Sequence, residues 1–499
     1  MKIWKLAGST ALALVGFGGA VQAITPEEVW GNWQAYYAQS GAELTVGNTS
    51  RNGDTLEVSG IAIKMTVDGE ASASIAFDKV NFKELGDGKV EITMSDVIPM
   101  EIFSSVEGES ISAMKMAIGQ TGMVTIASGT AEATSYEFTS PAQTIKITDI
   151  KDETGTPVDA VVDLALASVT GTYLVEAAGD QGGTLDSQLS AAGMDMTIVG
   201  RDADDGTEFT GTIKLADLKG SSKGGFVGAD LMKTMATAVN AGFSTDSDFT
   251  FGAMSVDFAV TENGAPTNIL AAATGGGLEA NISKAGITYG TFLNGFDLSV
   301  SGAAIPLPEV KLTMAETSFN MAVPIAKADA PQDFSLVTKL VDLSVSDDLW
   351  GIIDPAGTLP RDPVTLIVDT KGTATLTADL MDETLQDTPG EVNTLDLNQV
   401  LAKALGAEVT ADGGLTFDNS DLTTFGGMPA PTGAINVSLK GVNALIDNLI
   451  AIGILPEDQA MGARMMLGVF ARPGAGPDEL VSTIEFKDGG IFANGQQLQ

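Results

Sequence analysis

The chain has 499 residues and a formal net charge of −39 at pH 7, and it contains neither cysteine nor histidine. Without these residues it cannot form a Ser-His-Asp or Cys-His catalytic arrangement, a Cys/His zinc site, a CxxC redox pair or a haem with a His or Cys axial ligand. The acidic excess argues against nucleic acid and anionic membrane surfaces as partners, because phosphate binding needs basic patches. We expect no cofactor.

Residues 1–23 have the three parts of a secretion signal. Lys2 and Lys5 form the basic start, residues 6–20 are apolar and uncharged, and Val21-Gln22-Ala23 is a small-x-small cleavage site. The apolar run is shorter than the roughly 20 residues that span a bilayer. We therefore expect cleavage after Ala23, a periplasmic location and no transmembrane segment in the mature chain. The lack of cysteine excludes a lipid anchor on an N-terminal Cys.

A helix is predicted directly after the cleavage site. Thr25 is a good N-cap, Pro26 suits the first helical position, and acidic residues fill the first turn. The helix should run to about Ser40 and stop at Gly41. Its aromatic stripe is more typical of core packing than of a ligand site, and it comprises Trp30, Trp33, Tyr36 and Tyr37.

From Gly41 onward the pattern is that of strands. Apolar and polar residues alternate in residues 56–63, 73–77 and 90–94. Asn-Gly, Asp-Gly and Gly-Asp-Gly sequences separate the runs, and such sequences are typical of tight turns between antiparallel strands. The same texture continues to about residue 213 and predicts an antiparallel meander.

Helices are expected again in the second half of the chain. Helical spacing of apolar residues predicts amphipathic helices at 228–241, 346–353, 397–406, 440–452 and 456–470. The first carries Met235, and the last carries Met461 and Met465. A methionine-rich face can be an adaptable binding surface, although packing onto the sheet explains it more simply. These three residues are ligand-binding candidates.

One internal likeness is visible. Residues 182–194 align without a gap with residues 275–287, and both segments predict a strand, a turn at an Ala-Gly pair and a returning strand. Either a duplicated sheet module or chance convergence of two glycine-rich hairpins explains it.

Together these patterns predict a mainly β (α+β) protein. We expect extended, curved antiparallel sheets or meanders, short amphipathic helices packed on them and a candidate internal duplication. The expected order is a signal peptide (1–23), an N-terminal helix plus β meander (24–225), a repeat-like helix and β module (226–330) and a C-terminal β/α module (331–499).

Calcium is the metal that this composition best allows, because its hard oxygen ligands require neither His nor Cys. Asp202, Asp204, Asp205 and Glu208 surround a glycine turn. The segment lacks the acids at the fifth and twelfth positions of a helix-flanked calcium loop. A solvated acidic turn between strands explains the pattern better, so no metal is expected.

Arg361 lies in the most distinctive short motif, between two prolines that restrict its backbone. A rigidly held Arg could bind a carboxylate or a phosphate headgroup. A structural salt bridge with a neighbour such as Asp354 or Asp362 is the simpler interpretation. Arg361 is the fourth ligand-binding candidate.

Three stretches resemble an alphaproteobacterial family of exported proteins known only as a domain of unknown function, namely residues 24–37, 349–363 and 484–496. The resemblance implies periplasmic residence and brings no established activity or catalytic residue. The meander with scattered helices is also similar in texture to AsmA-type envelope proteins, which are associated with lipid traffic. That likeness concerns the fold and does not establish function.

We expect a non-enzymatic periplasmic or cell-envelope protein with a structural or binding role, whose partners are envelope proteins or lipid. A carboxylate-based hydrolase is the remaining enzymatic option, but 6% aromatic content offers few platforms for sugars. The alternative is a carrier of lipid or another hydrophobic ligand in a β groove. A carrier requires inward strand faces that are apolar and unfilled, whereas a scaffold requires a closed core.

Overall fold

A computed structural model of the chain describes residues 23–67, 71–106, 109–151, 156–177, 182–202, 205–232, 234–303, 305–382, 385 and 389–498. The expected secretion signal, apart from Ala23, lies outside the described residues. Strands make up 64% of the structure and helices 12%, so the predicted mainly β fold is confirmed. No helix within the described ranges is both long enough and apolar enough to span a bilayer.

The described residues form one antiparallel sheet of 27 strands. The N-terminal strands are β1 (Glu43–Thr45), β2 (Asn48–Asn52), β3 (Thr55–Val67), β4 (Ala71–Glu84), β5 (Val90–Met94), β6 (Val97–Val106), β7 (Glu109–Gly119), β8 (Val124–Gly129) and β9 (Ala133–Thr148). The middle strands are β10 (Asp159–Ala177), β11 (Gly183–Arg201), β12 (Glu208–Phe226), β13 (Thr245–Phe251), β14 (Met254–Glu262), β15 (Ala265–Ala273), β16 (Gly275–Ser283), β17 (Gly286–Gly302) and β18 (Val310–Pro324).

The C-terminal strands complete the sheet. They are β19 (Gln332–Val345), β20 (Val364–Leu376), β21 (Gly390–Ala404), β22 (Ala407–Asp418), β23 (Ala430–Lys440), β24 (Arg472–Pro473), β25 (Glu479–Lys487), β26 (Gly490–Ala493) and β27 (Gln496–Gln497). The α-helices are α1 (Pro26–Gln39), α2 (Met235–Asn240), α3 (Asp347–Ile353), α4 (Val442–Ala451) and α5 (Glu457–Phe470), and a 3₁₀ turn precedes α2 at Ala229–Leu231.

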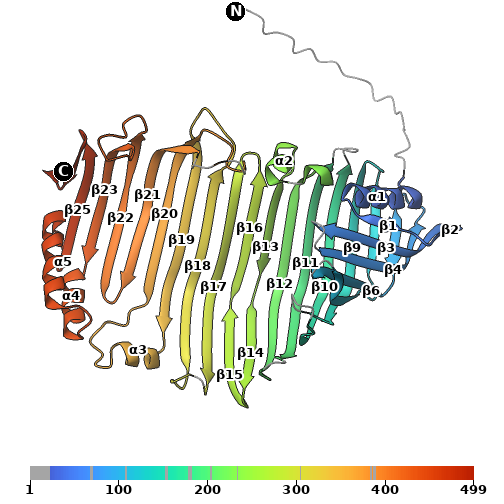
Figure 1. Cartoon of the computed structure of the whole chain (residues 1–499), viewed down its shortest axis with the longest axis horizontal. Coiled ribbons are helices and arrows are strands. Elements are labelled where there is room, and N and C mark those ends of the chain that lie inside the picture. The colour runs from blue at the N-terminus through green and yellow to red at the C-terminus, as the bar shows by residue number, and fades with distance from the viewer. Residues whose placement is uncertain are drawn as a thin grey trace, which may run out of the picture.

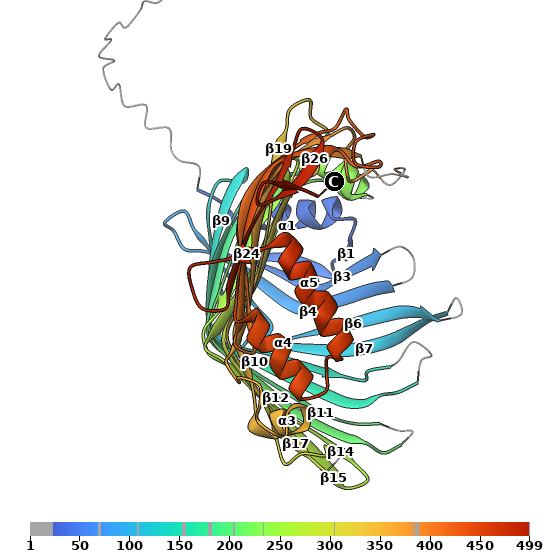
Figure 2. The same cartoon turned by 90° about the vertical axis from the view of Figure 1, so that its left-hand side faces the viewer.

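The sheet is a long, curved wall, with the N-terminal strands at one end and α4 and α5 at the other (Figure 1). Viewed along its length, it is open on one side, and α1 and α5 lie on that concave side (Figure 2). Sheet twist and irregular backbone positions curve such extended sheets. The wall is continuous across residue 225, which lies within β12, and the domain boundaries proposed at 225 and 330 stay predictions.

The two faces of the sheet differ sharply in composition. Directly paired residues of neighbouring strands point to the same side. One such row on the concave face carries no charge and comprises Leu189, Gly220, Phe249, Leu278, Thr291, Phe319, Thr338, Val368, Val400, Ala411 and Val437. The adjacent row on the convex face is polar and comprises Gln188, Ser221, Asp248, Glu279, Gly290, Asn320, Val337 and Asp369.

A crease crosses the sheet at mid-height. The ladder skips residue pairs there, and Ser168, Asp217 and Gly295 adopt left-handed φ angles of 51°, 53° and 57°. Apolar side chains that face the same way are spaced three residues apart across the crease, as in Leu215 and Leu218. The alternation therefore shifts by one residue, and both halves of each strand keep their apolar side chains on the concave face.

The main core lies at the N-terminal end. Trp30 of α1 packs there with Phe82 of β4, at a ring-centroid separation of 5.9 Å, and with buried residues of β3 and β5. A smaller cluster at the crease centres on Val169, Ala191 and Leu218. Most of the concave face is outside both clusters and is only partly buried.

Two expectations about local structure are wrong. Residues 397–404 belong to strand β21, and residues 405–406 form the turn to β22. A register shift between Leu397 and Val400 places both on one face at a three-residue spacing that imitates a helix. The stretch 182–194 has no turn, since β11 continues through it, whereas its counterpart does turn between Ser283 and Gly286. The helices expected near 25–40, 346–353, 440–452 and 456–470 are confirmed, and that near 228–241 is shorter.

A repeated strand arrangement is nevertheless present. In the first unit, β4 pairs with β5 and β6, β5 with β8, β6 with β7, and β9 with both β7 and β8. In the second unit, β12 pairs with β13 and β14, β13 with β16, β14 with β15, and β17 with both β15 and β16. The two units have the same connectivity, strand for strand.

Candidate functional site

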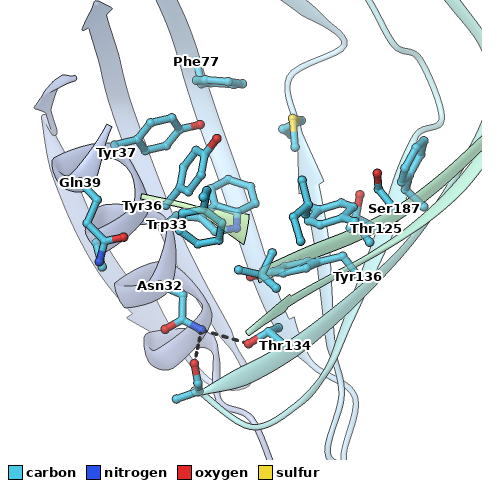
Figure 3. A pocket seen from close by; sticks show the side chains of 18 of the residues that line it. Asn32, Trp33, Tyr36, Tyr37, Gln39, Phe77, Thr125, Thr134, Tyr136 and Ser187 are labelled. Carbon is cyan, nitrogen blue, oxygen red and sulfur yellow. Dashed lines mark hydrogen bonds between the residues drawn. The ribbon is translucent and has the colours of Figure 1, made fainter. Parts of the chain in front are cut away.

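A pocket of about 600 Å³ lies between α1 and the concave face of the sheet (Figure 3). This volume is in the range of small-molecule sites. The pocket is lined by Asn32, Trp33, Ala35, Tyr36, Tyr37, Gln39, Phe77, Met94, Met123, Thr125, Ala131, Thr134, Tyr136, Phe138, Tyr173, Val175, Leu185, Ser187 and Phe226. One helix and seven strands thus contribute to it.

Local sequence explains how α1 is held over the sheet. Thr25 and Glu28 form a reciprocal capping box, in which the Glu28 carboxylate accepts from the Thr25 backbone N–H at 2.8 Å. Trp30 anchors the helix in the core. The amide of Asn32 donates to the carbonyl of Ala131 at 2.9 Å and to the hydroxyl of Thr134 at 3.0 Å (Figure 3). These contacts fix α1 as a roof over the pocket.

Aromatic rings form the walls. Four of the five tyrosines of the chain line this pocket, together with Trp33 and three phenylalanines. Tyr136 and Tyr173 stack with ring centroids 4.5 Å apart and an interplanar angle of 14°. Tyr36 and Tyr37 face each other edge-on at 5.7 Å. Eight of the 29 aromatic residues of the chain therefore line one pocket.

Glycines beneath aromatic rings shape the floor. Phe138 is paired directly with Gly171 on the next strand, and its ring lies where a Cβ of residue 171 would be. Phe226 lies over Gly183 in the same way, with its Cζ 2.6 Å from the position of such a Cβ. Five more Phe–Gly pairs repeat this arrangement across the sheet, namely Phe209–Gly200, Phe258–Gly211, Phe251–Gly276, Phe292–Gly277 and Phe334–Gly372. The glycines let the rings lie flat on the sheet.

The lining residues of the pocket include no charged side chain. Burial raises the pKa of Tyr136 to about 12, against a smaller opposing effect of hydrogen bonds with Trp33 and Thr134. Burial also raises the pKa of Tyr37 and, still more, that of Tyr173. The tyrosine hydroxyls are thus neutral at physiological pH, and the pocket offers apolar surface with a few neutral hydrogen-bonding groups.

The contacts of Arg361 hold parts of the structure together. Its guanidinium binds Asp347 of α3 at 2.6 Å and lies 5.9 Å above the ring of Trp350. Asp354 is fully buried and accepts a hydrogen bond of 2.7 Å from the Leu359 backbone N–H, which lowers its pKa. The motif thereby holds α3 and the loop to β20, and the salt-bridge partner of Arg361 is Asp347 in place of the Asp354 or Asp362 considered from the sequence.

The acidic turn contains hydrogen bonds of its own. The backbone N–H of Asp205 donates to the Asp202 carboxylate at 3.3 Å, and that of Thr207 donates to the Asp205 carboxylate at 2.8 Å. Asp204 lies outside the described residues, and Glu208 begins β12. Within the described part of the chain, no group of three or more His, Cys, Asp or Glu side chains is placed to hold a metal ion.

The methionine candidates lie away from the pocket. Met461 and Met465 on α5 are 71% and 68% exposed, so the simpler expectation that this face packs on the sheet is wrong. Met235 lies on α2 at the rim of the sheet (Figure 1) and is also exposed. None of the four ligand-binding candidates lines the pocket.

Sequence reasoning therefore missed the strand residues of the site. Only the α1 stripe was visible, and it was interpreted as core. That is right for Trp30, whereas Trp33, Tyr36 and Tyr37 line the pocket. The available signal was the uneven distribution of tyrosine: the chain has five tyrosines, and four of them lie before residue 174.

Comparison with known proteins gives little functional information. No curated protein matches the chain. Among solved structures, the chain is similar to BauA, the ferric preacinetobactin receptor from Acinetobacter baumannii, at 6% identity over 91% of this chain and 76% of that one, with a TM-score of 0.16. So low a score carries no argument about fold or function.

A family model does match the C-terminal part. It covers residues 291–498, which include two of the three stretches that carried the resemblance and exclude the pocket. The expectation of a domain of unknown function is confirmed for this region: residues 291–498 match the family described as an uncharacterized protein conserved in bacteria, DUF2125.

Proposed function

We propose that this protein is a non-enzymatic binding protein of the bacterial periplasm that holds the acyl chain of a lipid, or a similar hydrophobic molecule, between α1 and the concave face. The observation that carries this proposal is the uncharged, aromatic-lined pocket of about 600 Å³. Such a lining favours an apolar ligand, because a charged one would lose its hydration without gaining a partner.

The open apolar face supports the carrier over a closed scaffold. Leu189, Leu278 and Leu336 point to the concave side and are 48%, 43% and 38% exposed. Apolar surface left in water costs roughly 25 cal/mol per Å², so a continuous exposed apolar strip is typical of a binding surface.

The accessible area agrees with this view. The chain exposes 28303 Å², whereas a compact protein of 51.2 kDa exposes about 17,000 Å². The sheet is not folded around a filled interior.

Trp33 provides a direct test. A stearate carrying a nitroxide quenches tryptophan only on close approach, so its addition to the mature protein should quench Trp33. Trp30, whose ring centroid lies 6.5 Å from that of Trp33, is also within reach, so Trp33→Phe should reduce the effect. Ser187→Glu places a charge in the pocket and should weaken binding at least tenfold. Gln188→Glu adds the same charge to the same strand on the opposite face and should bind like the parent.

Two results would overturn the proposal. One is no saturable quenching of the parent protein below the critical micelle concentration of the probe. The other is equal affinity of Ser187→Glu and Gln188→Glu, with both variants folded by circular dichroism.

A further inference from the structure

The repeated strand arrangement makes the second unit comparable with the first, position by position. In the first unit, Tyr136 of β9 pairs with Ala127 of β8. In the second unit, β17 takes the place of β9 and β16 that of β8, and there Tyr289 pairs with Ala280. Tyr289 is the one tyrosine of the chain that does not line the pocket. It occupies the position equivalent to Tyr136.

The surroundings of Tyr289 are apolar. We call the set Leu278, Tyr289, Phe319, Met321, Leu336 and Val368 the distal patch. The ring of Tyr289 lies 6.3 Å from that of Phe319, and Met321 is its direct partner on β18. Leu278, Tyr289 and Leu336 are 43%, 41% and 38% exposed, so the patch is accessible.

The distal patch is continuous with the pocket. From Ser187 in the pocket, direct pairing leads through Ser222, Ser247 and Ala280 to Tyr289, without a charged side chain. On the convex side of these strands lie Asp186, Lys223 and Asp246. Charge is thus confined to the other face along the whole path.

We infer that the distal patch is a second acyl-chain-binding position, so that the concave face holds hydrophobic chains at two places. This inference rests on the proposed function. From β10 in the pocket to β18 in the patch there are six strand spacings of about 4.8 Å, about 29 Å along the sheet. That path is longer than an extended stearoyl chain, so the two positions take separate chains.

The distal patch should bind more weakly than the pocket. The pocket has α1 as a roof, whereas α2, the helix nearest to the second unit, lies at the rim of the sheet (Figure 1). A chain on the patch therefore keeps one side in water and loses part of the burial that drives binding. We expect an affinity at least several-fold lower than at the pocket.

The absence of cysteine makes the test simple, because a single introduced Cys is the only thiol. Thr338 lies on the concave face between Phe319 and Val368, and Val337 lies on the convex face between Asn320 and Asp369. Bimane-labelled Thr338→Cys and Val337→Cys are titrated with nitroxide stearate, and Trp33 quenching is recorded in the same samples.

The expected result is saturable quenching at position 338, several-fold stronger than at position 337. Leu336→Glu in the Thr338→Cys protein should abolish quenching at 338 and leave that of Trp33 unchanged, which also shows that the variant is folded. Leu278→Glu should do the same from a neighbouring strand.

The two proposals fail separately. Quenching of Trp33 with equal, weak quenching at 338 and 337 overturns the distal patch alone. Quenching at 338 without quenching of Trp33 overturns the pocket as the primary site and supports the patch. Quenching at neither position overturns both.

Discussion

At the scale of single residues, the pocket depends on neutral phenols. Tyr136 is 3% exposed, and burial raises its pKa from the ordinary value of 10.0 to about 12. In the unfolded chain this hydroxyl ionises near its ordinary pKa. Between about pH 10 and pH 12 the unfolded state therefore loses a proton that the folded state keeps, and stability falls as the pH rises.

The contribution is on the order of 2–3 kcal/mol, present in full below pH 10 and lost through pH 12. Urea unfolding at pH 9 and pH 12 should show this loss in the parent, and Tyr136→Phe should show a smaller loss by about that amount. Equal losses in the two proteins would show that Tyr136 ionises in the folded state as readily as in the unfolded one.

Glycine positions under aromatic rings have a similarly local effect. Gly171→Ala places a methyl group against the ring of Phe138 and 2.7 Å from the carbonyl oxygen of Gln188. We expect a destabilisation of about 1–3 kcal/mol from overpacking and weaker binding of nitroxide stearate, because Phe138 is displaced into the pocket.

The matched control for that substitution is Gly220→Ala. There the nearest atom to a new Cβ is the Asp248 carbonyl oxygen at 3.7 Å, an ordinary contact. Chemical denaturation should show little change or a slight gain in stability. A Gly171→Ala protein as stable as Gly220→Ala would mean that Phe138 does not lie over Gly171.

At the scale of elements, only a few contacts hold α1 to the strand side of the pocket. Asn32→Ala removes the hydrogen bonds to Ala131, just before β9, and to Thr134, within β9, at a cost of about 1 kcal/mol. We expect faster release of the bound probe, measured by stopped-flow recovery of Trp33 fluorescence. Gln34→Ala, on the exposed side of the same helix, should release it at the parental rate.

For helix α5 we expect the opposite result, namely that substitutions on its exposed face have little effect. Met461, Met465 and Met466 are 71%, 68% and 64% exposed, so substitution by Gln should change stability by no more than about 0.5 kcal/mol each. Thermal unfolding of the triple variant checks this. A loss of several kcal/mol would indicate that the face is buried in solution.

Element types were predictable where the local signal and the tertiary context agree. The capping box at Thr25 marks the start of α1, and Asn-Gly at residues 52–53 marks the hairpin between β2 and β3. The helix expected at 397–406 failed because the shifted register of β21 produces helical spacing without a helix. The crease shifts the apolar spacing of other strands in the same way. Ser168 adopts a left-handed backbone there, and serine is not a residue from which that conformation would be predicted.

The site was less predictable than the fold. Its walls come from α1, β9 and β10, and only the pairing of Tyr136 with Tyr173 brings the stacked rings together. Pairing register across a long sheet depends on every intervening strand, so it cannot be obtained from the alternation of one segment.

At the scale of the whole molecule, the net charge is strongly negative. A net charge of −39 produces self-repulsion, and the described ion pairs are exposed, so each offsets little of it. Raising the ionic strength from 0.01 M to 0.15 M shortens the screening length from about 30 Å to about 8 Å. The melting temperature should rise by a few degrees over this range, and a fall would show that attractive pairs dominate.

The shared connectivity of the two strand units has a consequence for how such a molecule can grow. Each unit begins and ends on a long strand. Another copy could therefore be inserted between β11 and β12, where its first and last strands would pair with these two strands. Neither α1 at one end nor α4 and α5 at the other would need to change (Figure 1). Relatives that differ in length by whole units would then share the same two ends and differ only in the length of the concave face between them.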